Sequence, residues 1–425
     1  KADKTLLKEL SKSDIELFEE ANKFYENGEF VKALRKLEAI QNKTSTVLNN
    51  MALLFHMEIK DYKKAEEYYL MAVKKGHTNA IYNLARLYQL ECKDYKKAEA
   101  YFLMGVEKGH PDSMNYLAML YKNEYKDYKK AEKYYRMAVK KGHPSAMYNL
   151  AMLYKDKYRD YKKAEEYFLM AVENGHTCSL NSLALLYKDT YKDYKKAEEY
   201  YLMAVGKGHT GALNNLALMY EDLKDIKKAE EYYRIAVDKG DTDAMKNLAM
   251  LYKNEYKDHE KEEEFYRMAV DKGDIAAMNN LAYFYFKQKK NKAIALALIN
   301  EAVKKKKDFF IMQTFALVLL WNNEIEEALK IGKDLWEDKE FVDNYPSNCK
   351  EYLILLMAKK QYYAALKLFE ESPFELKDRL KPVYYALMFF LKDDYPNEFI
   401  KMGDELKQTV EEIIAVVHQW EKDYA

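Results

Sequence analysis

Apolar side chains recur along this chain in two alternating helical stripes. In residues 144–154, "PSAMYNLAMLY", a set of apolar positions falls at i, i+3, i+4 and i+7, which places them on one face of an α-helix. In residues 161–172, "YKKAEEYFLMAV", a second set falls at i, i+3, i+7 and i+10, with lysines and glutamates on the flanks. The pattern predicts a pair of short amphipathic helices, which we call helix A and helix B.

The same pair is repeated at a nearly constant period. A glycine follows each helix B, and these glycines are spaced by 33, 33, 33, 33, 32 and 33 residues. They are Gly76, Gly109, Gly142, Gly175, Gly208, Gly240 and Gly273. A fixed period of this size is typical of stacked repeats, in which each unit buries its apolar face against its neighbours. The sequence therefore predicts a repeat array rather than a compact enzyme domain.

Local signals mark where each helix begins and ends. Asp160 stands where a side chain would cap the start of helix B, and Gly142 stands where left-handed backbone would end the preceding helix. His143 lies between that glycine and the next helix A, whereas later repeats place Asp241 and Asp274 there, and aspartate is the better cap. We therefore expect the recurring histidines to serve in turns and caps.

These residues carry a resemblance to a known family. The text "A-M-Y-N-L-A-M-L-Y" followed by "D-Y-K-K-A-E-E-Y-Y-x-M-A-V-x-x-G" resembles the tetratricopeptide repeat superfamily, and the short "A-V-K-K-G-H-P-S-A" junction resembles its Sel1-like branch. The resemblance implies an all-α, right-handed superhelical solenoid of antiparallel helix hairpins, with degenerate repeats at its ends. It also implies that function is found on a surface.

We expect four segments along the chain. Residues 1–46 form an N-terminal cap with a degenerate hairpin, and residues 47–287 form the Sel1-like array of 33-residue period. From residue 288 the tyrosine-rich text disappears while apolar helical stripes continue, so residues 288–406 are predicted to be degenerate hairpins. Residues 407–425 are predicted to be a capping helix.

Charge and cysteine content narrow the range of partners. Lys+Arg and Asp+Glu are equal at 70 each, which leaves no overall bias toward nucleic acid or an anionic membrane, although a local basic patch stays open. No apolar run approaches the ~18 residues that would span a bilayer. The three cysteines Cys92, Cys178 and Cys349 offer no disulfide framework, so we expect a cytoplasmic protein. The chain begins at Lys1, which favours a trimmed or processed form or part of a longer polypeptide, and a removed signal peptide would leave no trace.

Candidate chemistry is weak throughout the chain. The histidines His77, His110, His143, His176 and His209 lie in successive repeats on the order of 10 Å apart, whereas zinc ligands stand roughly 2.0–2.1 Å from one ion. The pair His259-Glu260 begins like the H-E-x-x-H zinc motif, but Glu263 replaces the second histidine. With no nucleophile elbow or P-loop either, we predict a protein that is not an enzyme and has no metal or cofactor.

An asparagine at the centre of helix A is the first candidate for binding. It recurs as Asn50, Asn83, Asn149, Asn215, Asn247 and Asn280, while Tyr116 and Ser182 depart from the pattern. In the resembling tetratricopeptide proteins this position faces a concave groove, where an amide can pair with an extended peptide. The alternative is a hydrogen bond to the adjacent repeat, and the sequence leaves both open.

Three positions further along helix A, a second set lies on nearly the same face. It comprises Arg86, Met119, Met152, Leu185, Leu218, Met250 and Tyr283. If this face is concave, the groove is largely apolar and rich in methionine, which suits an amphipathic helix or an apolar peptide. Ordinary core packing is the alternative interpretation. We expect the "KKAEE" runs to form a solvated convex face and the 40 tyrosines to belong mostly to the core.

The sequence thus favours a scaffold that binds a protein or peptide partner in the concave face built by the A helices. A second hypothesis is a sensor or regulatory arm of a larger polypeptide or complex. Nucleic-acid binding is a third and weaker hypothesis, because no basic track accompanies the tyrosines. Neither the partner nor the oligomeric state can be deduced.

Overall fold

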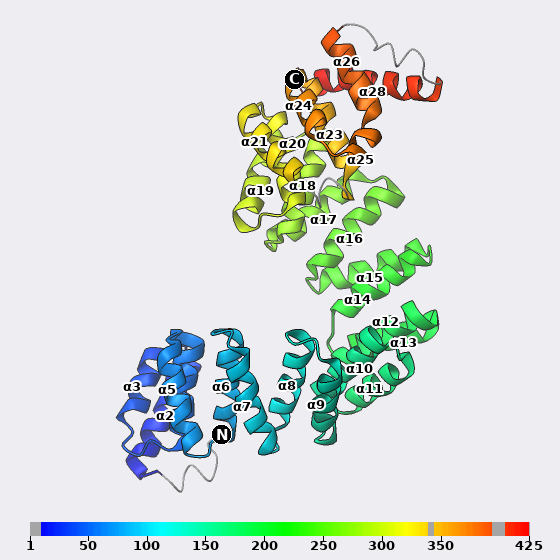
Figure 1. Ribbon diagram of the computed structural model, residues 1–425. Helices are drawn as coiled ribbons and strands as arrows, with labels where there is room; N and C mark the ends of the chain where they lie inside the picture. Colours follow the sequence, from blue (N-terminus) through cyan, green and yellow to red (C-terminus); the bar gives the residue numbers. More distant parts are fainter. Residues whose placement is uncertain (1–9, 339–343, 393–403, 425) are drawn as a thin grey trace. The chain divides into compact units, whose positions relative to one another are not determined.

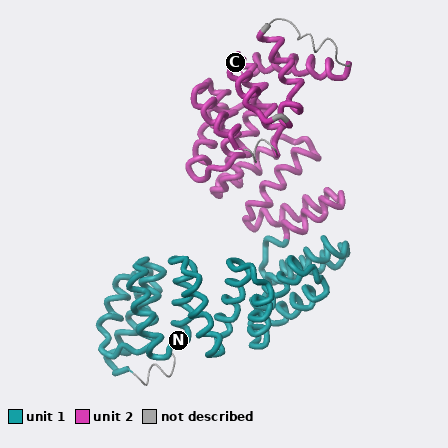
Figure 2. The backbone as a smooth tube through the Cα atoms, viewed as in Figure 1, with its two compact units in different colours: residues 1–212 teal, residues 213–425 magenta. Residues whose placement is uncertain are grey.

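The computed structural model describes residues 10–338, 344–392 and 404–424, and the regular secondary structure in these ranges is helical. Within them, 25 α-helices follow one another, mostly as consecutive hairpins, which confirms the predicted all-α repeat architecture (Figure 1). The chain divides into two compact units, residues 1–212 and residues 213–425 (Figure 2). None of the helices in the described ranges is long and apolar enough to cross a membrane.

Unit 1 contains six hairpins, each formed by a helix A and the helix B that follows it. Its A helices are α2 (Lys12–Glu26), α4 (Ser45–Leu53), α6 (Thr78–Leu90), α8 (Pro111–Asn123), α10 (Pro144–Leu153) and α12 (Cys178–Leu186). Its B helices are α3 (Phe30–Ala39), α5 (Tyr62–Lys74), α7 (Tyr95–Glu107), α9 (Tyr128–Lys140), α11 (Tyr161–Glu173) and α13 (Tyr194–Gly206). Each B helix up to α11 also packs against the next A helix, so the hairpins stack in chain order.

Unit 2 continues the alternation and then changes character. Its A helices are α14 (Gly211–Asp222, which begins at the unit boundary), α16 (Thr242–Leu251), α18 (Ile275–Gln288), α20 (Phe309–Trp321) and α23 (Pro346–Ala358). Its B helices are α15 (Ile226–Asp238), α17 (His259–Asp271), α19 (Lys292–Lys305), α21 (Ile325–Glu337) and α24 (Tyr362–Glu371). They are followed by α25 (Phe374–Arg379), α26 (Lys381–Lys392) and α28 (Asp404–Asp423). The last of these packs against α23 and α26.

The predicted caps explain why the helices are short. The side chain of Asp160 accepts the backbone N–H of Lys163 at 3.1 Å, and Gly142 has a φ of 73°, the left-handed conformation that glycine adopts without steric penalty. His143 caps α10 through Nδ1, which accepts the N–H of Ala146 at 3.1 Å. The predicted starts and ends of these helices are therefore confirmed.

The loop from helix A to helix B has a conformation that the sequence did not reveal. Four A helices end in a π-helical turn, and the loop to helix B then places at least one residue in left-handed backbone. The turns are η1 (Leu54–Ile59), η2 (Tyr154–Tyr158), η3 (Tyr187–Tyr191) and η4 (Tyr252–Tyr256). In the seven repeats from α4 to α17 the left-handed residue is a lysine or arginine, as at Lys126 (φ 54°) and Arg159 (φ 53°), although glycine would be less strained there. The α2–α3 loop has Gly28 (φ 75°) and the α20–α21 loop has Asn323 (φ 67°) instead.

A tyrosine near the end of helix A joins three neighbouring helices. The hydroxyl of Tyr121 donates to Glu99 on α7, its ring stacks on Tyr134 of α9 with centroids 5.6 Å apart, and the ammonium of Lys130 lies 4.9 Å from the ring centre. The same three contacts recur at Tyr88, Tyr154, Tyr187 and Tyr252. Each such tyrosine therefore ties its own hairpin to the preceding one.

The protonation states strengthen this contact at neutral pH. Burial, followed by the hydrogen bond with Glu132, raises the pKa of Tyr154 to about 12. Burial alone would raise the pKa of Glu132, but hydrogen bonds from Tyr154 and Arg136 lower it below its ordinary value. The bond is therefore one between a neutral hydroxyl and an ionised carboxylate, and hydrogen bonds to charged groups are stronger than neutral ones.

Histidine caps make unit 1 sensitive to acid. Nδ1 of His77 accepts the N–H of Ala80 at 3.1 Å, and burial lowers the pKa of His77. A protonated imidazole cannot accept at Nδ1, so protonation removes the cap. Because the folded pKa lies below the unfolded value of about 6.5, this stability is present above that pH and is lost as the pH falls through the folded pKa.

We expect His77→Asp to keep α6 capped to lower pH. Near pH 7.5 the variant should be at least as stable as the wild type, and near pH 5.5 its advantage should be larger by about 1 kcal/mol, the size of a typical N-cap. Urea unfolding at the two pH values measures the effect. The reciprocal change Asp241→His at the start of α16 should introduce acid sensitivity into unit 2. An identical pH response of wild type and both variants would contradict the argument.

Candidate functional site

Three rows of side chains run across the A helices, and we call the surface that they form the A face. In unit 1 the first row is Asn49, Tyr82, Asn115, Tyr148 and Asn181, and the second row is Asn50, Asn83, Tyr116, Asn149 and Ser182. The third row is Leu53, Arg86, Met119, Met152 and Leu185, all half-buried. In unit 2 the rows continue as Asn214, Lys246 and Asn279, then Asn215, Asn247 and Asn280, then Leu218, Met250 and Tyr283.

The second-row asparagines hold successive repeats together. Nδ2 of Asn83 donates to Oδ1 of Asn49 at 3.0 Å. Asn149 donates to Asn115 at 3.0 Å, and Asn247 donates to Asn214 at 2.9 Å. Asn215 also makes an interaction within the protein. Of the two roles that the sequence left open, the hydrogen bond between repeats is therefore present at Asn83, Asn149 and Asn247, and peptide binding stays a prediction.

The departures from the asparagine pattern follow the same pairing. Tyr116 occurs where the first row of the preceding repeat holds Tyr82, and the two rings meet edge to face with centroids 5.3 Å apart. Ser182 likewise follows a repeat with Tyr148 in the first row. An asparagine occupies the second row where the first row of the preceding repeat offers an amide, so within unit 1 the two rows change together.

The residues of the first row were not among those predicted from the sequence. Its asparagines recur at the same period as the second row, one residue earlier, so the signal was available. It was obscured because Tyr82 and Tyr148 alternate with the asparagines, and because the bond joins residues 33 or 34 positions apart in different rows.

The third row is largely apolar, whereas the first two rows hold mainly amides and tyrosines. Met119, Met152, Leu185 and Leu218 are half-buried, and Met250 is 46% exposed. Arg86 lies against its neighbours, since its guanidinium carbon is 4.3 Å from the ring centre of Tyr116 and Nη1 donates to the hydroxyl of Tyr82 at 3.0 Å. The apolar stretch of this row in unit 1 is therefore Met119, Met152 and Leu185.

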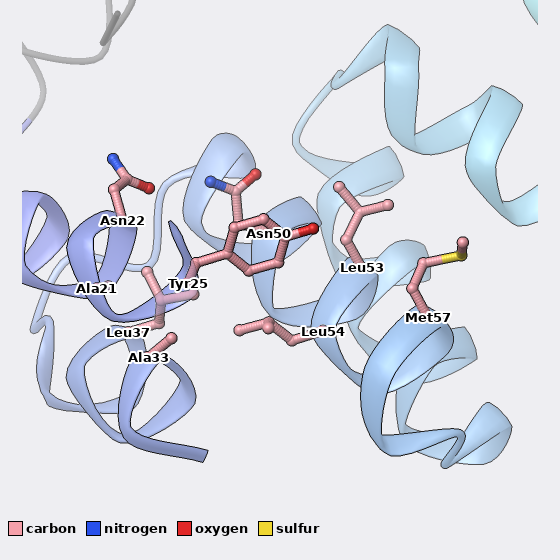
Figure 3. A pocket seen from close by; sticks show the side chains of 9 residues that line it. All are labelled: Ala21, Asn22, Tyr25, Ala33, Leu37, Asn50, Leu53, Leu54 and Met57. Atoms are coloured by element: carbon pink, nitrogen blue, oxygen red, sulfur yellow. The ribbon is translucent and has the colours of Figure 1, made fainter. Parts of the chain in front are cut away.

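A pocket of about 250 Å³ opens beside Asn50 (Figure 3). It lies among α2, α3 and α4, and its apolar lining includes Leu53 of the third row and the exposed Met57. The side chains of Asn22 and Asn50 supply amides, and the ring of the exposed Tyr25 points from α2 toward Asn50 and Leu53 (Figure 3). This pocket brings the predicted Asn50 together with residues that were not predicted.

In unit 2 the chain's own C-terminus lies against the end of α18. The ring of Tyr424 stacks on Phe286 with centroids 4.9 Å apart, and Nζ of Lys287 lies 5.7 Å from the ring centre of Trp420. The hydroxyl of Tyr283 donates to Glu351 on α23 at 3.0 Å. Part of the third row of unit 2 is thus engaged within the protein.

Two other predicted residues line a pocket of unit 2. Met250 and Asn280 lie together in a pocket of about 430 Å³, which is also lined by Glu262, Tyr266 and Lys287. The predicted positions in the two units therefore do not converge on one centre. They form rows, with a pocket near Asn50 in unit 1 and another near Asn280 in unit 2.

His259, which begins the text that resembles H-E-x-x-H, makes a local contact. Nδ1 of His259 lies 2.9 Å from Glu262, within one helix, which is a local pair. Across the described ranges, no group of three or more histidines, cysteines or carboxylates is placed to hold a metal ion.

Stacked helical hairpins with a short, glycine-closed junction define a class of α-helical repeat protein. Family models match this chain as Sel1 repeat at residues 48–77, 78–110, 111–143, 144–176 and 275–306, and as tetratricopeptide repeat at residues 192–244. The chain is a Sel1-like repeat protein of the tetratricopeptide repeat superfamily. Such repeats generally act as scaffolds for protein–protein interaction and are typically without enzymatic activity.

Solved structures resemble the chain at low identity, while no curated protein matches it. One is c5321, a protective antigen of uropathogenic Escherichia coli, with 18% identity, a TM-score of 0.34, and coverage of 92% of this chain and 95% of that one. Yeast Tom70 shares 16% identity at a TM-score of 0.35, covering 96% of each chain. A Sel1 repeat protein from Oxalobacter formigenes shares 21% identity at a TM-score of 0.39, covering 52% of this chain and 96% of that one.

The paired rows make a prediction about stability. Asn149→Ser should destabilise the protein by about 1–2 kcal/mol, because Asn115 is buried and loses its amide partner. Adding Asn115→Tyr recreates the combination found at Tyr148 and Ser182 and should recover most of the loss. Urea unfolding of the two single variants and the double variant measures the coupling. Strictly additive effects would contradict the pairing, and Ser182→Asn, placed after a tyrosine, is the control expected to gain nothing.

Proposed function

We propose that this protein is a scaffold that binds a segment of a partner polypeptide on the A face of unit 1, and that this face is the concave one. The observation that carries the proposal is the apolar stretch Met119, Met152 and Leu185, which is half-buried, and so partly open to solvent, across three successive A helices. Apolar rows that stay partly open to solvent are typical of protein-binding surfaces. In unit 2, by contrast, the chain's own C-terminus engages the end of α18.

The chemistry of the rows suits a polypeptide ligand. Methionine is flexible and polarisable, so Met119 and Met152 can adapt to different apolar side chains. Asn149 uses its Nδ2 between repeats, and its carboxamide oxygen retains acceptor capacity for a main-chain N–H of the ligand. The hydrogen bonds between asparagine side chains and the tyrosine contacts hold the rows in place before binding. The entropy lost by the scaffold on association would therefore be small.

Selection from a displayed random-peptide library against the full chain tests the proposal. Met119→Glu/Met152→Glu should weaken binding of the selected peptides by at least about tenfold, because each substitution places a charge in the apolar stretch. Fluorescence anisotropy with labelled synthetic peptides measures the affinity.

A matched control makes the same substitutions on B helices. Met71 on α5 and Met203 on α13 are 46% and 50% exposed, so Met71→Glu/Met203→Glu adds equal charge away from the A face. We expect that control to retain binding, with circular dichroism confirming that both variants fold. Failure to select any peptide that depends on Met119 and Met152 would overturn the proposal, and so would equal loss in the control.

A further inference from the structure

Three consecutive loops of unit 1 are strongly basic, although the chain as a whole is neutral. Residues 122–130, 155–163 and 188–196 run from the end of helix A through the connecting loop into the first turn of helix B, and we refer to each whole segment as a loop. Together they hold thirteen basic and six acidic side chains. The corresponding loops of unit 2, residues 221–228 and 253–261, hold equal numbers of each. The excess is therefore a local feature of one part of the array rather than of the repeat itself.

Five of the six acidic side chains in these loops either cap a helix or lie close to a lysine. Asp127, Asp160 and Asp193 cap the following helices, accepting backbone N–H groups at 3.0, 3.1 and 3.1 Å. Asp127 and Asp160 also lie 3.7 and 2.9 Å from the ammonium groups of Lys130 and Lys163. The remaining positive charge is then carried by residues such as Lys126, Arg159 and Lys192, which are exposed.

This basic edge adjoins the apolar stretch of the A face. Lys122, Lys155 and Lys188 follow Met119, Met152 and Leu185 by three positions. Lys122 is one turn further along α8, and Lys155 and Lys188 take the corresponding places in the π-helical turns η2 and η3, so each lysine stands at the end of helix A next to the apolar row. Lys155 and Lys188 lie 4.0 and 3.7 Å from the aspartates that follow them in sequence. Contacts of this kind near the surface contribute little. An apolar row and a basic row therefore run in parallel across three repeats.

We propose that the partner segment on this face is acidic and amphipathic, with apolar side chains on Met119, Met152 and Leu185 and carboxylates along the row of Lys122, Lys155 and Lys188. The inference rests on the proposed function and adds the chemical class of the ligand. A row of positive charge gives orientation and a fast, salt-dependent association, whereas the apolar row gives most of the affinity.

A nucleic acid fits this surface less well. Its phosphates would meet the lysines, but it offers no apolar counterpart to Met119, Met152 and Leu185. The exposed loop tyrosines are poor platforms for bases, because the rings of Tyr158 and Tyr191 already pack on Tyr154 and Tyr187 with centroids 5.5 and 5.2 Å apart. The observations therefore favour a polypeptide.

The peptides selected under the proposed function provide the test. We expect those that depend on Met119 and Met152 to carry a net negative charge. For a labelled selected peptide, the affinity should fall at least about tenfold between about 50 and about 300 mM NaCl. Its counterpart with Asp and Glu changed to Asn and Gln should bind at least about tenfold more weakly.

Matched variants of the protein locate the charge. The variant Lys122→Gln/Lys155→Gln/Lys188→Gln should bind the acidic peptide about tenfold more weakly than the wild type. The control Lys224→Gln/Lys253→Gln/Lys257→Gln removes three charges from loops of unit 2, and its affinity for the peptide should change less than about twofold. Thermal unfolding checks that both variants fold.

The two proposals fail in different ways. If the selected peptides depend on Met119 and Met152 but are neutral or basic, the inference about charge is overturned and the proposed function stands. If a 20-nucleotide uridine RNA or a phosphatidylserine vesicle binds more tightly than the acidic peptide, the inference is also overturned. If no peptide depends on the A face, the proposed function itself fails, and the charge inference falls with it.

Discussion

The contact between each hairpin and the next is the interaction on which this structure depends. One hairpin of about 30 residues buries too little apolar surface to offset the conformational entropy of folding, so its stability comes from its neighbours. The buried alanines and aromatic residues of helices A and B bring the hairpins together without specifying their register. Register comes from directional contacts: the Tyr121 hydroxyl reaches back to Glu99, and the Asn149 amide reaches back to Asn115. These bonds fix how one repeat sits on the next, and so fix the rows of the A face.

Most of the fold could be predicted because its signals are local. Asp160, Gly142 and His143 each act within a few residues of their own position, so a single repeat contains the information that starts and stops its helices. The left-handed lysines and π-helical turns were not predictable in the same way. Their residue types do not favour that backbone, and the geometry follows from packing the end of helix A against the next helix B. The docking of Tyr424 on Phe286 joins residues 138 positions apart, and no periodic text marks it.

The sequence could predict which positions make up the candidate site, but not which contacts their side chains make. The period identified the second-row asparagines and the apolar row, yet an amide pointing toward a groove and an amide pointing toward its neighbour look alike in sequence. What distinguishes them is the partner one row away, as at Asn49 and Asn83. Tyr116 and Ser182 depart from the asparagine pattern, and the first row shows that they change together with Tyr82 and Tyr148. Correlated changes inside a repeat array can thus carry structural information without any alignment of relatives.

The same geometry assigns different tasks to adjacent rows. An asparagine whose side-chain nitrogen donates a hydrogen bond to the neighbouring repeat contributes to stability. That nitrogen is then less available to bind a ligand. Rather than on these amides, recognition would then depend on the half-buried apolar row and the charges at its border. These can vary from repeat to repeat with little effect on the fold, as the basic loops of unit 1 and the neutral loops of unit 2 illustrate. Because the repeats use similar contacts for stacking, an array of this kind can change its ligand by substituting the charged residues beside the apolar row. Its architecture would stay the same.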